Sequence, residues 1–155
     1  MRRSPSRTRA PGIPPDKNGY RISTDPSELD LGMVHGYLKE SYWAAGVPED
    51  VVRRSIKNTL CFGVYRDAEQ VGFARVITDR ATFAYLADVF VLKAHRGRGI
   101  GRWLVRVILS HPDLQGLRRW MPATRDAHEL YRSYGFAELG CPQIFTRRKD
   151  SSYGV

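Results

Sequence analysis

A glycine- and arginine-rich turn at residues 96–101 is the part of the chain best suited to bind an anion. It lies between an apolar segment, residues 83–92, and a segment whose apolar residues recur at helical spacing. The first amides of a helix lack internal partners and carry the positive end of the helix dipole, so they favour an anion. Glycines leave those amides open and permit positive φ, and arginines add charge, so the turn predicts a cradle for phosphate or pyrophosphate. The residues expected to bind it are Arg96, Gly97, Arg98, Gly99, Ile100 and Gly101.

The spacing of the glycines excludes two common phosphate-binding motifs. A dinucleotide-binding G-x-G-x-x-G that begins at Gly97 needs glycine or alanine at position 102, where this chain has Arg102. A P-loop needs Gly-Lys-Ser/Thr, which does not follow the turn. The pattern that remains is Arg-x-x-Gly-x-Gly directly after a strand ending in Val-Phe-Val.

The elements expected around this turn form a single α/β domain. Short links predict antiparallel hairpins among the middle strands, and the helix after the turn predicts that the following strand returns parallel. The first helix is expected to enter at Asp25 through a capping box of Ser27 and Asp30 and to end at Gly46, and Asp126 is expected to cap the last helix. The expected strands are residues 20–23, 60–66, 71–78, 82–92, 118–123, 136–139 and 143–148, and the later helices are 48–58, 99–111 and 128–134.

A second pattern occupies residues 124–136, which read Thr-Arg-Asp-Ala-His-Glu-Leu-Tyr-Arg-Ser-Tyr-Gly-Phe. Together with the turn, the chain resembles the GNAT superfamily of acyl-CoA-dependent N-acyltransferases, whose second signature is usually N-x-x-A-x-x-L-Y-x-x-x-G-F. Only the first position departs, because Thr124 replaces asparagine. The resemblance spans about residues 20–148. It implies the element order β-α-α-β-β-β-α-β-α-β-β, with a mixed, mostly antiparallel central sheet and helices on both faces.

The resemblance also implies acetyl-CoA as co-substrate and suggests where it binds. The pyrophosphate would lie on the glycine turn, with Thr124 among the cofactor-binding residues. The pantetheine arm would add to the splayed edge of the strand before the turn, along Val89, Phe90 and Val91, through backbone groups of Val89 and Val91. A local bulge in that strand would direct an N–H at the thioester carbonyl as an oxyanion donor. A donor with a longer acyl chain stays open.

Tyr131 matches the tyrosine that, in the family, protonates the departing coenzyme A thiolate. A phenol with a pKa of about 10 beside a thiol of about 8.5 can donate to a developing thiolate. The alternative is that Tyr131 only packs on the sheet. The resemblance and the chemistry together favour the role of general acid.

Asp88 interrupts the most apolar strand, and it is the only carboxylate between Asp79 and Asp113. A buried charge needs a partner or a purpose. Three interpretations stay open: Asp88 binds a cationic amine, passes the amine's proton through water, or pairs with a nearby cation such as Arg75. Aromatic residues that would line an acceptor pocket are Tyr42, Trp43, Phe83 and Tyr85, with core packing as the alternative for each.

Composition sets outer limits on function. The chain has 155 residues, a formal net charge of +9 and 42% hydrophobic residues, which suits one globular domain at residues 20–150 behind a flexible basic tail at residues 1–19. Outside the tail the positive charges are scattered apart from the glycine turn, so the charge pattern does not favour a nucleic-acid partner. The sequence shows no membrane span, no secretory apolar region and no metal-ligand spacing, and two cysteines indicate no disulfide framework. A cytoplasmic protein without a metal is expected, and a homodimer stays open.

Two interpretations of function compete most closely. One is an N-acetyltransferase that moves the acetyl group of acetyl-CoA to a primary amine of a small molecule or peptide by direct attack in a ternary complex. The other is a non-catalytic sensor that binds acyl-CoA and acts on a partner protein. Tyr131 and the complete turn favour the enzyme, and the identity of the amine cannot be read from the sequence.

Overall fold

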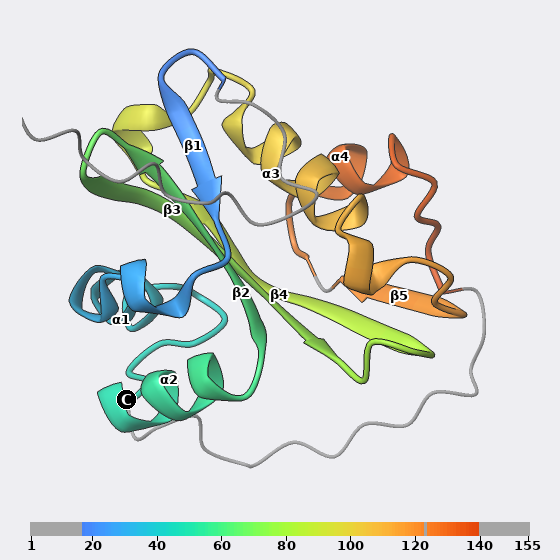
Figure 1. Ribbon diagram of the computed structural model, residues 1–155, viewed down its shortest axis with the longest axis horizontal. Coiled ribbons are helices and arrows are strands. Elements are labelled where there is room, and N and C mark those ends of the chain that lie inside the picture. Colours follow the sequence, from blue (N-terminus) through green and yellow to red (C-terminus); the bar gives the residue numbers. More distant parts are fainter. Residues whose placement is uncertain (1–16, 123, 140–155) are drawn as a thin grey trace, which may run out of the picture.

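A five-stranded mixed sheet organises the fold. The computed structural model describes residues 17–122 and 124–139 of the chain (Figure 1). The first four strands run antiparallel to their neighbours, and the last runs parallel to β4, as the sequence predicted. The sheet order is β1-β2-β3-β4-β5, with β1 at Tyr20–Ser23, β2 at Leu60–Arg66, β3 at Glu69–Thr78, β4 at Phe83–Val91 and β5 at Arg119–Pro122.

Helices cover both faces of this sheet, which confirms the expected layering (Figure 1). On one face lie α1 (Leu31–Leu38) and α2 (Glu49–Lys57), and on the other lie α3 (Ile100–Leu109) and α4 (His128–Arg132). Each face has its own core, because alternate strand residues point to opposite sides. None of the helices in the described ranges is long and apolar enough to cross a membrane. The core under α3 includes Phe62, Val76, Leu86, Leu104 and Ile108, and the core under α1 includes Val34, Leu38, Val52, Phe73 and Phe90.

The first helix is shorter than the sequence predicted, and the predicted capping box is wrong. Asp25 caps a separate 3-10 turn (Pro26–Glu28) by accepting a bond from the backbone N–H of Ser27. Asp30 caps α1 itself, since its carboxylate accepts from the backbone N–H of Met33 at 2.9 Å. After Leu38 the chain turns instead of continuing as helix, so the segment that carries Tyr42 and Trp43 is a loop.

The last described segment departs from prediction in two ways. Asp126 does not cap α4, which begins without a side-chain cap. The hydroxyl oxygen of Thr124 accepts bonds from the backbone N–H groups of Asp126 (3.3 Å) and Ala127 (3.0 Å) in the turn before that helix. Gly135, with φ of +86°, follows the helix as expected. Residues 136–139 form no strand, and their expected neighbour at residues 143–148 lies outside the described residues. The element order through α4 is therefore as expected, the strand expected at residues 136–139 is wrong, and the strand at residues 143–148 stays a prediction.

The tight β3–β4 turn depends on one carboxylate. Asp79 accepts hydrogen bonds from the backbone and hydroxyl of Thr82 and from the backbone N–H groups of Ala81 and Phe83. These bonds, led by those from Thr82, hold the pKa of Asp79 well below its usual range. We expect Asp79→Ala to lower the melting temperature at neutral pH.

The sign of the pH dependence follows from that lowered pKa. The stabilisation is complete above the pKa of an unfolded aspartate, about 3.9, and is lost as the pH falls towards the lower pKa of the folded state. Melting curves from about pH 7 to pH 3 should show the difference between wild type and Asp79→Ala shrinking at the acidic end. A difference that stays constant across this range would contradict this origin for the stabilisation.

Candidate active site

Strand β4 carries a bulge at Asp88 and Val89, in the strand where the resemblance to the GNAT superfamily implied one. Across the ladder, Phe73 faces Phe90 and Arg75 faces Ala87, so two residues of β4 lie opposite the single residue between them on β3. Asp88 has φ of +53°, a left-handed conformation that aspartate tolerates better than most residues. A bulge bends the strand and leaves backbone N–H and C=O groups unpaired that would be hydrogen-bonded in a regular ladder.

Among the residues that the structure describes, no strand pairs with the same stretch of β4 on its other side. Pairing with β5 begins at Phe83 and stops at Leu86, which faces Pro122, so residues 87–91 run beyond the parallel ladder. The backbone N–H of Leu92 donates to Val71 on β3. Because such bonds alternate along an antiparallel pair, Val91 turns its own N–H and C=O towards the open edge. The guanidinium Nε of Arg96 already donates to that carbonyl at 2.8 Å.

The glycine turn has the backbone geometry that its composition predicted. Gly97 and Gly99 have φ of +76° and +75°, and Gly99 precedes α3 without any side chain capping the first amides. Arg96 is bonded to the protein itself, through Val91 and through the hydroxyl of Tyr37 at 3.0 Å. Arg98 is exposed and makes no ion pair with any residue that the structure describes. Within the described ranges, the turn therefore presents open amides and the guanidinium of Arg98 without an ion pair.

Asp88 forms the ion pair with Arg75 that was one of its three interpretations. One carboxylate oxygen accepts from Arg75 Nε, and the other accepts from the indole Nε1 of Trp43 at 2.9 Å. The two charged side chains are only 10% and 18% exposed, so each depends on the other for compensation. Cys61 faces Arg75 across the β2–β3 ladder, and burial raises the pKa of its thiol.

Aromatic side chains connect Asp88 to the loop before α4. Trp43 contacts Tyr42 edge to face, with ring centroids 5.0 Å apart, and both rings are more than 40% exposed. The hydroxyl of Tyr42 accepts from the backbone N–H of Arg125 at 3.2 Å, and the Arg125 guanidinium lies 3.9 Å from the centre of the ring. Tyr42 thus connects the loop after α1 to the loop before α4.

Tyr131 lies beside this connection. It is 7% exposed, its ring meets Phe136 edge to face, and burial, with a smaller effect from Tyr42, raises the pKa of its phenol to about 12. The phenol therefore keeps its proton throughout the neutral range. The hydroxyl makes no hydrogen bond with another residue in the described part of the chain.

Other predicted site residues take different positions. Phe83 faces Arg119 at the start of β4, roughly 17 Å of strand from Asp88 at the usual rise per residue. Tyr85 is half-buried two residues further along the same strand. The side-chain oxygen of Thr124 accepts from the backbone N–H groups of Asp126 and Ala127, in the turn just before α4. The structure thus groups Tyr42, Trp43, Asp88 and Tyr131 and does not bring Phe83 to them.

Two residues of the site were missed in the sequence. Tyr37 stacks on Phe90 at a centroid distance of 3.8 Å and anchors Arg96, and its position three residues after Val34 could have indicated an inward face. No local sequence pattern indicated Arg125, because its partner Tyr42 lies 83 residues away in the sequence. No group of three or more His, Cys, Asp or Glu side chains that could hold a metal ion is found within the described ranges.

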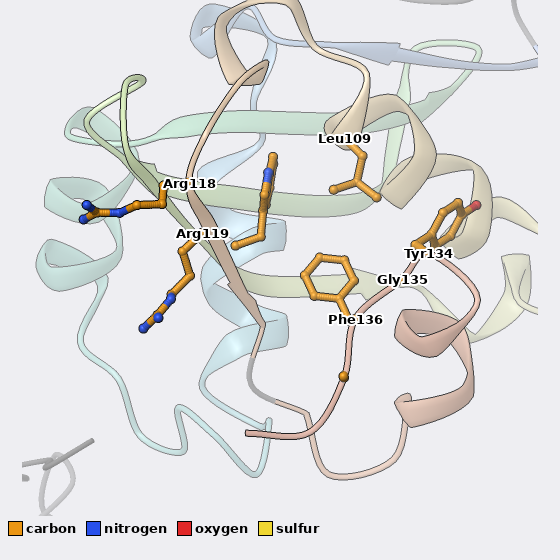
Figure 2. A pocket seen from close by; sticks show the side chains of 8 residues that line it. Leu109, Arg118, Arg119, Tyr134, Gly135 and Phe136 are labelled. Atoms are coloured by element: carbon orange, nitrogen blue, oxygen red, sulfur yellow. The ribbon is translucent and has the colours of Figure 1, made fainter. Parts of the chain in front are cut away.

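A separate hollow of about 360 Å³ lies at the other end of α3 from the glycine turn. Figure 2 shows Leu109, the last residue of α3, pointing into it near Phe136, with Arg118 and Arg119 on the opposite wall. Its position at the start of β5 separates it from the bulge, so it is not part of the site described above.

Known proteins resemble this chain in both sequence and structure. The model of the acetyltransferase (GNAT) domain family matches residues 57–138. A Gibberella zeae protein, provisionally named an acetyltransferase, is 34% identical over 138 residues, 74% of this chain and 77% of that protein. A Xanthomonas campestris crystal structure, provisionally assigned to GNAT acetyltransferases, has a TM-score of 0.84 and 48% identity, covering 93% of this chain and 100% of that one.

A Clostridium acetobutylicum structure, of a provisionally assigned acetyltransferase with acetyl-CoA, shares the fold with a TM-score of 0.61 at 11% identity. The match covers 83% of this chain and 94% of the Clostridium chain. The matches to the family model and to the Gibberella protein show that the chain belongs to the GNAT family, and it is an acetyltransferase.

Proposed function

We propose that this acetyltransferase moves the acetyl group of acetyl-CoA to a primary amine of a small molecule or peptide, by direct attack in a ternary complex. The observation that carries the proposal is the β4 bulge beside the edge of that strand that no described residue pairs with, together with Tyr131 near Tyr42, which contacts Trp43 beside Asp88. Acyl transfer needs an oxyanion donor, an aligned nucleophile and a proton for the leaving thiolate.

The cofactor would be held by backbone groups and by the glycine turn. Open amides at Gly97 to Gly101, with Arg98, fit a diphosphate, because they present N–H groups and positive charge without side chains in the way. Along the open edge of β4, the backbone of Val89 and Val91 fits the amides of a pantetheine arm, which would add there like a short strand. Acetyl-CoA supplies the thioester, and a backbone N–H at the bulge would bind its carbonyl oxygen.

The amine would approach from the side of Asp88. Both carboxylate oxygens already accept one hydrogen bond each, and a carboxylate retains further lone pairs for an ammonium or amine hydrogen. Tyr42 and Trp43 present exposed aromatic surface beside it, which suits a cationic acceptor. The raised thiol pKa of buried Cys61 supports direct attack over an acyl-enzyme, because only a thiolate is a strong nucleophile.

Thiol release from acetyl-CoA across a panel of primary amines tests the proposal. We expect release above the amine-free blank for at least one cationic amine, and mass spectrometry should find that amine acetylated on nitrogen. Calorimetric binding of coenzyme A together with no release above the blank for any amine would favour the alternative, an acyl-CoA sensor.

The variant Asp88→Asn distinguishes a role of Asp88 in binding the amine substrate from a role in stability alone. Asparagine also tolerates positive φ and can accept from Trp43, so the change mainly removes the charge opposite Arg75. An unpaired buried partner costs on the order of 3 kcal/mol, so the melting temperature should fall. If Asp88 also binds the amine, KM for cationic acceptors should rise or kcat should fall, while the affinity for coenzyme A stays unchanged.

The control is the double variant Arg75→Met with Asp88→Asn, which removes both charges. It should recover part of the lost stability and none of the lost acceptor affinity. Full activity per folded molecule in Asp88→Asn would show that the residue is only structural.

A further inference from the structure

The N-terminal turn at Lys17–Tyr20 has a fixed backbone. Lys17 and Tyr20 exchange both of their backbone hydrogen bonds, at 2.9 and 2.8 Å. Asn18 and Gly19 between them have φ of +49° and +81°, as a two-residue hairpin turn with positive φ at both positions requires. The sequence placed Lys17 in the flexible tail, whereas it is the first strand-paired residue that the structure describes.

Tyr20 ties this turn to the start of the glycine turn. Its ring is 1% exposed and contacts His95 edge to face, and its hydroxyl is 2.8 Å from His95 Nδ1. The same hydroxyl accepts from Arg66 at 3.0 Å. His95 directly precedes Arg96, so β1 and the glycine turn are held together by buried contacts and not by proximity alone.

This anchoring brings the ammonium of Lys17 to the mouth of the glycine turn. Its Nζ lies 3.1 Å from the place that a Cβ on Gly99 would occupy. Lys17 is half-buried and makes no ion pair with any carboxylate in the described ranges. The glycine turn beside it, residues 96–101, contains two further cationic residues, Arg96 and Arg98, and no acidic residue. Like charges that lie close together repel one another, and a bound anion would offset that repulsion.

We propose that Lys17 is a ligand of the diphosphate of coenzyme A, and that the N-terminal turn at Lys17–Tyr20 positions it beside the glycine turn. The inference rests on the proposed function only in placing the diphosphate at this turn. Lysine binds phosphate as a point charge, in addition to the directional bonds from backbone amides. The N-terminal turn at Lys17–Tyr20 is therefore part of the proposed cofactor site.

The test compares two ligands that differ in their phosphates. Calorimetry measures the affinity of wild type, Lys17→Met and Lys17→Arg for coenzyme A, and competition measures their affinity for pantetheine, which has no phosphate. Methionine keeps most of the stem and removes the charge. The matched control is Lys57→Met, a lysine at the end of α2 on the other face of the sheet.

We expect Lys17→Met to bind coenzyme A about 10- to 100-fold more weakly, the usual value of a hydrogen bond to a charged group. The affinity for pantetheine should stay unchanged, Lys17→Arg should recover most of the loss, and the effect should shrink as salt is added. Unchanged affinity for coenzyme A in folded Lys17→Met, or an equal loss for pantetheine, would overturn the inference. Because the readout is affinity and not turnover, the inference and the proposed transfer can fail separately.

Discussion

A Gly99→Val protein should fold and lose most of its affinity for coenzyme A. The residue has φ of +75°, so a β-branched side chain strains the backbone by on the order of 1–3 kcal/mol. The larger effect is local, because the added Cβ lies where an anion must approach the first amides of α3 and within 3.1 Å of Lys17 Nζ. Calorimetry should show at least about 100-fold weaker binding, as expected when several charge-assisted bonds are lost together.

Gly116→Val is the matched control for that strain. Gly116 has φ of +71°, and a Cβ added there would meet no atom within 4 Å, but the residue lies in the loop before β5 and outside the glycine turn. The variant should lose similar stability and keep its affinity for coenzyme A. Wild-type affinity in a folded Gly99→Val protein would remove the glycine turn from the cofactor site.

Tyr131→Phe should lower kcat by about 10²- to 10⁴-fold, the usual contribution of general acid catalysis. The change keeps the ring and its contact with Phe136 and removes one proton donor. KM for acetyl-CoA should stay within a few-fold, because the lost interaction strengthens only as charge develops on sulfur. Tyr134→Phe is the matched control, since that hydroxyl donates to the carbonyl of Arg102 and is not part of the proposed site.

The pH profile gives a second check on Tyr131. Burial raises its pKa to about 12, so the donor stays protonated well beyond the ordinary phenol value of about 10. Wild-type kcat should therefore show no loss from this group up to about pH 10, while an ordinary phenol would be half ionised there. The neutral phenol of Tyr131 is also compatible with burial, so its contribution to the stability of the fold is complete below about pH 10. That contribution is lost as the pH rises towards 12 and the hydroxyl ionises. Wild-type kcat in Tyr131→Phe, with chemistry rate-limiting, would exclude Tyr131 as the acid.

Local signals explain why much of the site could be predicted. The glycine turn, the strand before it and the helix after it are adjacent in sequence, so the period of the apolar residues and the glycine spacing were sufficient. The bulge in β4 was predicted from the resemblance to the GNAT superfamily and not from Asp88 itself. The side-chain oxygen of Thr124 accepts from the backbone N–H of Ala127 just before α4, a bond that an asparagine side chain could also accept.

Contacts between distant residues explain what could not be predicted. Asp25 and Asp30 are both good helix caps, and only packing decides that the first of them begins a 3-10 turn and the second begins α1. The Tyr42–Arg125 contact and the approach of Lys17 to Gly99 join segments more than 80 residues apart. Neither leaves a periodicity in the sequence.

One measurement tests direct transfer within a ternary complex most directly. The enzyme is mixed with isotopically labelled acetyl-CoA, with and without an amine found in the thiol-release panel, and the label is followed by mass spectrometry of both protein and small molecules. We predict that the label moves to the amine only when both substrates are present, with one thiol released per acetyl group, and that it never appears on the protein. Label on the protein in the absence of amine, at Cys61 or elsewhere, would contradict direct attack.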